Sequence, residues 1–462
     1  MYRIADVQVV DPRDGSVTAH QDVRVADGRI AGISATTGPD GDPTTADGRG
    51  RFAVPGFVDM HAHPLNLGDP GPELGLMLAF GITGYRQMSG TADLLRRRGG
   101  SASTDRVPAL LATPGAVLTP LNAGKPDTAV AEVRRQARDG ADFIKAALIT
   151  PEVYFAVQAE ADRLGIPVVG HLPAGVDVRA ASDAGFRSIE HVGPGLGVLT
   201  GCSCHEEHLR AATPSSPIKA PPFRIPFADR VAEKVLAKIV VNPAQLTGPA
   251  TLRAVRDAID SFDEDKAREL ARRFAANGTW NCPTLIRVKA QQLCDAPEFA
   301  ADPDLRYATA KERAAWTAAA TAFRRKFDGS ERAVFAEQFA LQSRVVRILD
   351  EEGAPLLAGS DAVGAAWVVA GASLHDEFDL LADAGLSPLR VLQTATTNPA
   401  RFLGREDDAG TVEAGKEADL VLLDDDPTAS VANLRAVSAV VRGGRFHDTA
   451  ALTALKERAT GR

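Results

Sequence analysis

The sequence predicts an α/β protein that consists of a (β/α)8 TIM barrel and a small β-sandwich. Two observations predict this architecture. In the middle of the chain, short apolar runs alternate with longer amphipathic segments, a pattern typical of repeated strand–helix units around a parallel sheet. At both ends of the chain, apolar and polar residues alternate in short runs separated by turn residues such as Asp-Gly, which indicates hairpin-connected antiparallel strands.

The length of the chain indicates two domains. Its 462 residues exceed the roughly 250–300 residues at which a single core stops growing. We assign residues 1–53 and 405–462 to a composite β-sandwich, and residues 54–404 to the barrel. Two stretches, at about 193–277 and 287–352, are longer than barrel loops need to be, and we interpret them as helical elaborations after strands six and seven. They would form a lid, a substrate pocket or an oligomer interface. Helix-compatible patterns within them cover residues 228–236, 252–274 and 331–349.

Eight apolar runs are the predicted barrel strands. In such a barrel the carboxyl ends of the strands form one face, and this face carries the catalytic groups. Polar residues that follow the runs are therefore the candidate functional residues. The runs are residues 56–60, 82–87, 109–112, 143–146, 167–169, 188–189, 280–285 and 355–357.

The charge pattern argues against nucleic acid as a partner. The net charge is −8, and the basic runs are short and isolated, whereas nucleic-acid binding needs a concentrated basic face. No stretch approaches the roughly 18 apolar residues of a membrane span, and the N-terminus lacks the apolar run of a signal peptide. We therefore expect a soluble, cytoplasmic protein with no membrane partner. We also expect a homo-oligomer that acts on a small-molecule substrate.

The four cysteines do not form a disulfide framework in so long a chain. Cys202 and Cys204 lie close to His205 and His208, and together these residues could hold a metal ion. Their spacing fits no standard zinc module. We therefore favour a polar loop with free thiols.

Four of the nine histidines fall at the ends of predicted strands. His61 and His63 close the first run, and they face the same side because side chains in a strand repeat every two residues. His171 and His191 each follow a short run and lie twenty residues apart, about one strand–helix repeat. Imidazole is a common ligand of zinc-like ions. Taken singly each histidine suits a structural role, but taken together they predict a metal site.

Two further polar residues end apolar runs. Asp361 follows the last run; a carboxylate there can ligate an ion and accept a proton from water, or cap the following helix. Lys145 ends the fourth run, where an ammonium group in an apolar setting is costly without a partner. It could form a carbamate with CO2, a Schiff base or a salt bridge. We favour packing or capping roles for Arg86, Tyr154, Trp367 and His375, which also lie near predicted strand ends or loops.

In combination, these motifs resemble the amidohydrolase superfamily, in the branch of imidazolonepropionase-like hydrolases and metal-dependent prolidases. The resemblance covers nearly the whole chain in order. It implies a metal-dependent hydrolase that cleaves the C–N bond of an amide, peptide, urea or carbamate-type small molecule. The matching segments are residues 54–63, 81–83, 142–145, 170–171, 188–191, 282–285, 358–361, 395–400 and 410–421.

The resemblance further implies a binuclear centre of two divalent ions. Carboxylated Lys145 would bridge the ions, and a bridging hydroxide would attack a carbonyl group polarised by the more exposed ion. Asp361 would pass the proton to the leaving nitrogen. Zinc is the favoured metal, while manganese, cobalt and iron also suit these ligand types. The implied ligands are His61, His63 and Asp361 for the more buried ion, His171 and His191 for the more exposed ion, and Lys145 for both.

Two other functions compete with this hypothesis. One is a mononuclear deaminase or cyclic-amide hydrolase in which Lys145 is only structural. The other is a catalytically silent scaffold; such proteins usually lose metal ligands, whereas this chain keeps all six. No Gly-x-Ser-x-Gly nucleophile turn occurs. Residues 410–416 have the spacing Gly-x-x-x-x-Gly-Lys, but Glu417 follows them in place of the Ser or Thr of a phosphate-binding loop.

Overall fold

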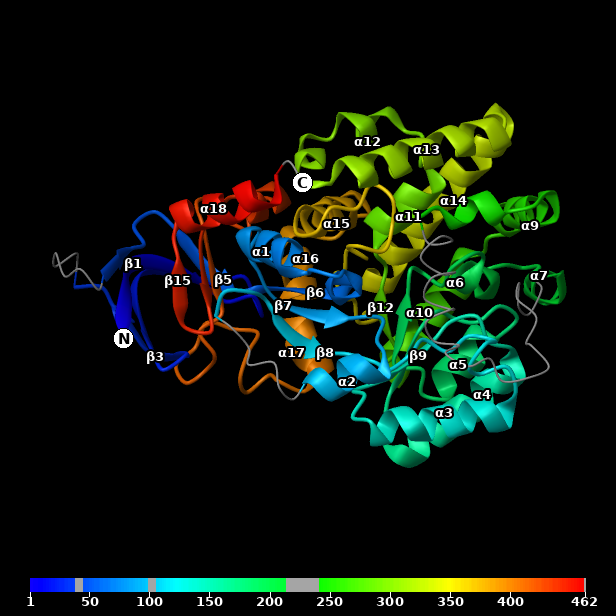
Figure 1. Ribbon diagram of the computed structural model, residues 1–462, viewed down its shortest axis with the longest axis horizontal. Helices are drawn as coiled ribbons and strands as arrows, with labels where there is room; N and C mark the ends of the chain where they lie inside the picture. The colour runs from blue at the N-terminus through cyan, green and yellow to red at the C-terminus, as the bar shows by residue number, and fades with distance from the viewer. Residues whose placement is uncertain (38–44, 99–104, 213–240, 461–462) are drawn as a thin grey trace.

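Strands from both ends of the chain share one sheet in the computed structural model, which describes residues 1–37, 45–98, 105–212 and 241–460 (Figure 1). The strand order is β15-β14-β13-β5-β1-β2-β3, and β4 pairs with β1. The sheet is mixed, because β1 runs parallel to β4 and β5 and antiparallel to β2. The strands are β1 (Tyr2–Val10), β2 (Val17–Ala26), β3 (Arg29–Ala35), β4 (Thr45–Asp47), β5 (Phe52–Pro55), β13 (Leu420–Leu423), β14 (Val437–Arg442) and β15 (Arg445–His447).

This arrangement differs from the expected sandwich, because hydrogen bonds join the described strands in a single sheet. The reason is that β5 pairs with β1 on one side and with β13 on the other, so neither half keeps the free edge that a separate sheet would have. Ile4, Val23, Leu420 and Val441 bury their side chains in one apolar cluster, so both ends of the chain contribute to the same core. The division into domains at residues 53/54 and 404/405 stays a prediction.

The middle of the chain forms two parallel sheets, with strand orders β6-β7-β8 and β12-β11-β10-β9. Seven of the eight predicted runs overlap these strands. The run at 280–285 is shorter than expected, because Pro283 has no N–H for the sheet and the chain then enters a helix. The strands are β6 (Phe57–Ala62), β7 (Ile82–Gln87), β8 (Ala109–Ala112), β9 (Ile144–Ala146), β10 (Val168–Gly170), β11 (Ser188–Glu190) and β12 (Trp280–Cys282).

Isolated parallel bridges lie between the ends of these two sheets. Pro114 pairs with Phe143 and Leu118 with Ala146, which brings the chain after β8 beside β9. The eighth predicted run, at 355–357, contributes one bridge, from Leu356 to Asn281 of β12. The residues after it return to β6, where the Asp361 N–H donates to the carbonyl oxygen of His61 at 2.7 Å. Strand-like segments thus follow one another around the centre of a TIM-barrel-like α/β fold.

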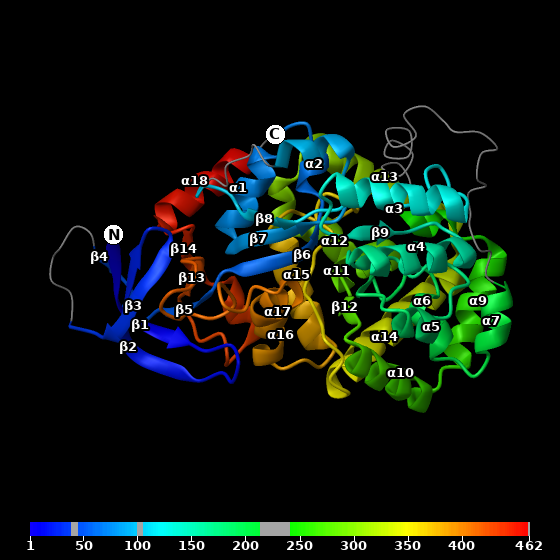
Figure 2. The ribbon, with the colours of Figure 1, turned by 90° about the horizontal axis from the view of Figure 1, so that it is seen from below.

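Helices cover the outer side of the parallel strands (Figure 1 and Figure 2). Local sequence explains their limits. In α4, for example, the Thr150 hydroxyl accepts the Val153 N–H, Pro151 occupies the first position, and Gly165 ends the helix with a left-handed φ of 67°. These helices are α1 (Gly71–Ala79), α2 (Ala92–Arg98), α3 (Pro126–Arg138), α4 (Pro151–Leu164), α5 (Val178–Asp183), α15 (Ala372–Asp383), α16 (Pro388–Ala395) and α17 (Thr397–Leu403).

The two predicted elaborations are helical where the structure describes them. The pattern at 228–236 lies outside the described residues. The pattern at 252–274 is split into α9 and α10, because the Asp263 carboxylate accepts the Lys266 N–H and starts a new helix. A final helix, α18 (Thr449–Ala459), was not expected and packs against α1. The elaborations contain α6 (Gly197–Gly201), α7 (Glu206–Ala212), α9 (Pro249–Asp260), α10 (Glu264–Asn277), α11 (Leu285–Gln292), α12 (Pro297–Ala301), α13 (Ala310–Lys326) and α14 (Gly329–Glu351).

Close packing of Gly359 places the last segment directly against the first parallel strand. A Cβ atom at Gly359 would lie 2.7 Å from Cys282 Sγ, 2.7 Å from His61 Cβ and 2.9 Å from the His61 nitrogen. A methyl group fits only if the backbone or these neighbours move. Glycine is therefore required here by space.

We predict that Gly359→Ala lowers the free energy of unfolding by about 1–3 kcal/mol, because added volume in a packed core forces strain. Urea denaturation would measure this. The matched control is Gly329→Ala at the start of α14, where nothing lies within 4 Å of an added Cβ; we expect its effect to stay within about 0.5 kcal/mol. Equal stability of the two variants would contradict the packing argument.

Candidate metal centre

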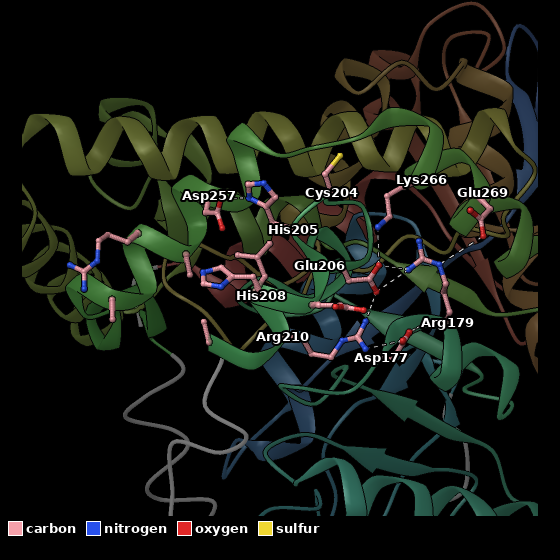
Figure 3. A pocket seen from close by; sticks show the side chains of 16 residues that line it. Asp177, Arg179, Cys204, His205, Glu206, His208, Arg210, Asp257, Lys266 and Glu269 are labelled. Carbon is pink, nitrogen blue, oxygen red and sulfur yellow. Dashed lines mark hydrogen bonds and ion pairs between the residues drawn. The ribbon is translucent and has the colours of Figure 1, made fainter.

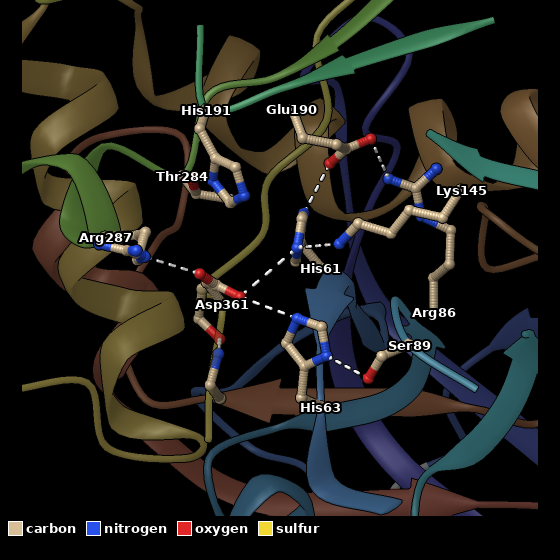
Figure 4. Close-up of polar contacts among 12 residues, drawn as sticks. His61, His63, Arg86, Ser89, Lys145, Glu190, His191, Thr284, Arg287 and Asp361 are labelled. Atoms are coloured by element: carbon tan, nitrogen blue, oxygen red, sulfur yellow. Dashed lines mark hydrogen bonds and ion pairs between the residues drawn. The ribbon is translucent and has the colours of Figure 1, made fainter. Parts of the chain in front are cut away.

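Imidazole, ammonium and carboxylate groups meet at the carboxyl ends of the parallel strands (Figure 4). His63 Nε2 lies 3.0 Å from Asp361 Oδ1, and His61 Nε2 lies 3.4 Å from the same oxygen. Lys145 Nζ lies 3.3 Å from His61 Nε2. These four side chains come from β6, from the residue that follows it, from β9 and from the last parallel segment, so folding brings together residues that are up to 300 positions apart.

The remaining two predicted ligands extend the cluster. The His191 ring centroid lies 4.5 Å from that of His61, and the His171 centroid lies 5.2 Å from that of His191. The ligand atoms of His61, His191 and Asp361 all lie within 4.8 Å of one another. The structure therefore brings all six sequence-predicted residues into one group, with His171 at its edge.

Three of the four imidazoles have their Nδ1 atom engaged by a neighbour. His61 Nδ1 lies 2.7 Å from Glu190 Oε2. The corresponding partners are the hydroxyl groups of Ser89 for His63, at 2.7 Å, and Thr284 for His191, at 2.5 Å. Contacts of this kind orient metal-binding histidines and leave Nε2 as the ligand atom.

The hydrogen-bond roles at His61 provide a test of whether a cation fits here. An ionised Glu190 can only accept, so the proton of the His61 ring lies on Nδ1, and Nε2 carries a lone pair. That lone pair faces Asp361 Oδ1, another acceptor, at 3.4 Å. Two acceptors at this distance repel each other unless positive charge lies beside them. The donor set, made of neutral imidazoles and carboxylate, suits divalent transition-metal ions.

Burial shapes the charges of the centre. It is the largest effect on all four histidines and lowers their pKa; Lys145 lowers it further, whereas Asp361 acts in the opposite direction, and the net pKa lies below the usual value. Burial also lowers the pKa of Lys145 to about 8, although Asp361 and Glu190 act in the opposite direction. Burial alone would raise the pKa of Asp361, but His61, His63 and His191 hold it well below its usual value. The carboxylate therefore stays ionised.

Sequence reasoning missed Arg287, which contacts the same carboxylate. Arg287 lies in the first turn of α11 and donates from Nε to Asp361 Oδ2 at 2.9 Å. Asp361 thus turns one oxygen to the histidines and the other to a guanidinium group. No pattern in the sequence of α11 marks this residue.

The connection between β12 and α11 places both Thr284 and Arg287 at the centre. Thr284 turns the chain with a left-handed φ of 46°, and α11 begins immediately after it. Glu377 of α15 accepts the N–H of Ile286 at 2.8 Å and so satisfies one of the free N–H groups at the start of the helix. A buried glutamate therefore fixes the start of the helix that carries Arg287.

Backbone strain concentrates in the same region. Among the described residues, nine non-glycine positions have a positive φ, and six of them lie at this centre or in the loops after its strands. Such conformations cost of the order of 1–3 kcal/mol each and cluster at functional sites. The six positions are His191, Val192, Thr284, Asp361, Val363 and Trp367.

All four residues for which we favoured packing or capping roles are buried. Trp367 donates from Nε1 to the Cys294 carbonyl oxygen at 2.9 Å, and Tyr154 and His375 are at most 2% exposed. Arg86 is different, because its guanidinium donates to Glu190 Oε1 at 2.9 Å and so reaches His61 through Glu190.

A separate pocket lies beside α7, α9 and α10 (Figure 3). Its charged groups largely pair with each other; the Glu206 carboxylate, for example, accepts from Arg179 at 3.0 Å and from Lys266 at 3.1 Å. His205 Nδ1 lies 2.7 Å from Asp257, and Cys204 donates to Asp263 at 3.3 Å. Cys202 is buried, and His208 is exposed. The metal-ligand groupings among the described residues lie at the centre above, not in this pocket.

Comparisons with known proteins find similarity to amidohydrolases and prolidases. The model of the amidohydrolase family matches residues 336–446. A bottromycin amidohydrolase is 28% identical, with a TM-score of 0.70 over 99% of this chain and 89% of its own. A Xaa-Pro dipeptidase with methionine in its active site is 18% identical (TM-score 0.60, 97% and 99% covered). A prolidase described as putative, from Bifidobacterium longum, is 19% identical (TM-score 0.62, 99% and 98% covered). A search of curated proteins found no match.

Glu377 gives a prediction that does not depend on metal. Burial raises its pKa to about 8; backbone N–H groups of Ile286 and Leu285 lower it, whereas Asp59 and Asp376 raise it. Between about pH 4.5 and about pH 8 the folded protein therefore holds a proton that the unfolded chain has released. The free energy of unfolding should fall as pH rises through this window, by up to about 1.4 kcal/mol per pH unit.

Glu377→Gln should remove this contribution. The difference in unfolding free energy between the variant and the unmodified protein, measured by urea denaturation across the window, should grow with pH in favour of the variant. Glu457→Gln, at an exposed position of α18, is the matched control and should leave the pH dependence unchanged. Parallel pH curves for Glu377→Gln and the unmodified protein would contradict the assignment.

Proposed function

We propose that this chain, which is similar to proteins of the amidohydrolase family, is a metal-dependent hydrolase that cleaves the C–N bond of an amide, peptide, urea or carbamate-type small molecule. The observation that carries this proposal is the group of neutral imidazole nitrogens that faces the ionised Asp361 carboxylate. The amidohydrolase and prolidase names of the similar structures support C–N cleavage.

We assign two divalent ions to the centre, with zinc as the favoured metal. When bound, such ions supply Lewis acidity, which lowers the pKa of water and polarises a carbonyl group. The engaged Nδ1 atoms support Nε2 as the ligand atom of His61, His63 and His191. The ligands in this proposal are His61, His63 and Asp361 for the more buried ion, His171 and His191 for the more exposed ion, and Lys145 as a bridge.

Asp361 moves the proton in this proposal. Its carboxylate takes the proton from the attacking water and gives it to the leaving nitrogen, while Oδ1 faces the histidine nitrogens. Arg287 Nε contacts Oδ2 at 2.9 Å and fixes the plane of the carboxylate. The same contact keeps the carboxylate from rotating away from the histidines.

Lys145 suits a carbamate better than the other options that its sequence position leaves open. Its amine would combine with CO2 to give a carbamate and release one proton. A salt bridge is disfavoured, because no carboxylate among the described residues lies within 4.0 Å of Nζ. The side chain is only 4% exposed, and Nζ lies 3.3 Å from His61 Nε2, so a carboxylate group added there would lie among the histidines.

We also propose that the parallel strands close into a (β/α)8 barrel. The support is the set of bridges that link the segments after β8 to β9, residue 356 to β12, and residue 362 to β6. None of the described helices is long and apolar enough to cross a membrane. A cytoplasmic location and a homo-oligomeric state stay predictions.

Removal of metal should abolish activity. We expect chelated protein to lose hydrolysis of its substrate, found in a screen of N-acyl amino acids, dipeptides, aryl ureas and carbamates, and to recover it with zinc, cobalt or manganese. Elemental analysis should give two ions per chain. Asp361→Asn, in which the carboxylate can no longer take the proton, is the inactive control. Full activity in metal-free protein would refute the proposal, and one ion per chain would favour the mononuclear alternative.

Lys145→Ala should lose at least one ion per chain and lower kcat/KM by at least about 100-fold, because the bridging ligand is absent. Intact mass spectrometry of the unmodified protein should show the added mass of one CO2, absent from the variant. Lys266→Ala, in the separate pocket, is the control and should keep both ions. An unchanged metal content in Lys145→Ala would make the lysine structural only.

A further inference from the structure

We propose that Glu190 and Arg86 are positioning residues that fix His61 as a ligand of the more buried ion. This inference rests on the proposed function, because it requires an ion at the centre. Glu190 engages both carboxylate oxygens: Oε2 lies 2.7 Å from His61 Nδ1, and Oε1 accepts from Arg86 at 2.9 Å and from the Ser188 hydroxyl at 2.7 Å. All four side chains are fully buried.

Arg86 is held in place by groups other than Glu190. Its Nε donates to the Met60 carbonyl oxygen at 2.6 Å. Its guanidinium carbon lies 5.7 Å and 5.0 Å from the ring centroids of Phe143 and Phe402, distances at which an aromatic face attracts a cation. The positive charge is thus fixed in a region closed to water. Its position compensates the negative charge that Glu190 brings into the core.

The carboxylate determines which nitrogen of His61 carries the proton. A carboxylate only accepts, so the ring must donate from Nδ1, and Nε2 is left to bind an ion. The partners of His63 and His191 are the hydroxyl groups of Ser89 and Thr284. The Ser89 hydroxyl donates to Asn66 Oδ1 at 2.9 Å, and the Thr284 hydroxyl donates to the Pro283 carbonyl oxygen at 2.8 Å, so each accepts from its histidine as a neutral group. Among the ligands with a known Nδ1 partner, His61 alone has its tautomer imposed by charge.

This difference predicts a selective effect on metal binding. Loss of the Glu190 charge should release His61 to adopt the other tautomer, in which Nε2 carries a proton and cannot bind an ion. Partners of metal ligands typically contribute 10-fold to 100-fold to metal affinity. We therefore expect Glu190→Gln to weaken one of the two ions by about 10-fold to 100-fold and to leave the other unchanged.

The experiment titrates metal-free protein with Co²⁺ and follows the visible absorption of the bound ion, together with elemental analysis after gel filtration. Glu190→Gln keeps the shape of the side chain. Arg86→Met removes the cation and leaves the Glu190 carboxylate buried without its partner. This unpaired charge can unfold the protein. The double variant Arg86→Met/Glu190→Gln therefore removes both charges together. We expect the double variant to bind metal no more weakly than Glu190→Gln alone, because both residues act through one contact.

Two controls separate positioning from general damage. Ser188→Ala deletes one hydrogen bond to Glu190 but keeps the contacts to Arg86 and His61, so its metal affinity should stay close to that of the unmodified protein. Far-ultraviolet circular dichroism should show that each variant is folded. If folded Glu190→Gln shows an altered spectrum and a lower affinity for just one of the two ions, the inference is supported. An equal loss of affinity for both ions overturns it.

The outcomes also distinguish this inference from the proposed function. If the unmodified protein binds no metal ion, the proposed function fails, and the inference fails with it. If the unmodified protein binds two ions and Glu190→Gln binds both with unchanged affinity, the proposed function stands and the inference is wrong.

Discussion

The contact between Asp361 and the imidazoles of His61 and His63 is the interaction on which the rest of the centre depends. It joins the last parallel segment to the first one. It also places two acceptor atoms, His61 Nε2 and Asp361 Oδ1, close together in a region closed to water. Such an arrangement is stable only with positive charge beside it. In the protein without metal, the Lys145 ammonium group, 3.3 Å from His61 Nε2, supplies that charge. Carbamate formation would convert this positive charge to a negative one, so in our proposal carboxylation of Lys145 and metal binding depend on each other.

Much of this centre follows from local sequence patterns. The spacing of His61 and His63 places both on one face of a strand, and the apolar runs before His171, His191 and Asp361 predict that these residues lie at strand ends. These inferences need only the period of a strand and the rule that a barrel carries its polar groups on one face. The grouping of the side chains in the structure agrees with them, and the resemblance to the amidohydrolase superfamily is confirmed.

Other features depend on tertiary contacts that no local pattern records. Glu190 precedes His191 in the chain, yet its function in our proposal depends on Arg86, which is 104 positions away, and on His61. Arg287 lies in a helix of ordinary composition and reaches Asp361 only because Thr284 turns the chain and Glu377 fixes the helix start. The eighth parallel segment has the apolar pattern of a strand. In the structure, however, it contributes only a single bridge to β12. The single mixed sheet likewise results from the pairing of β5 with β13, and the paired residues are 365 or more positions apart in the chain.

The pairing of β5 with β13 also limits how the chain can be divided. β5 ends at Pro55, only one residue before β6, the strand that carries His61. A fragment limited to the parallel part would lose the strands that pair with β5. The N–H and C=O groups of β5, or of the start of β6, would then be unpaired, and such exposed strand edges promote pairing with other chains. Moving the parallel part into a chimeric protein would therefore require the carboxyl-terminal strands to be moved with it.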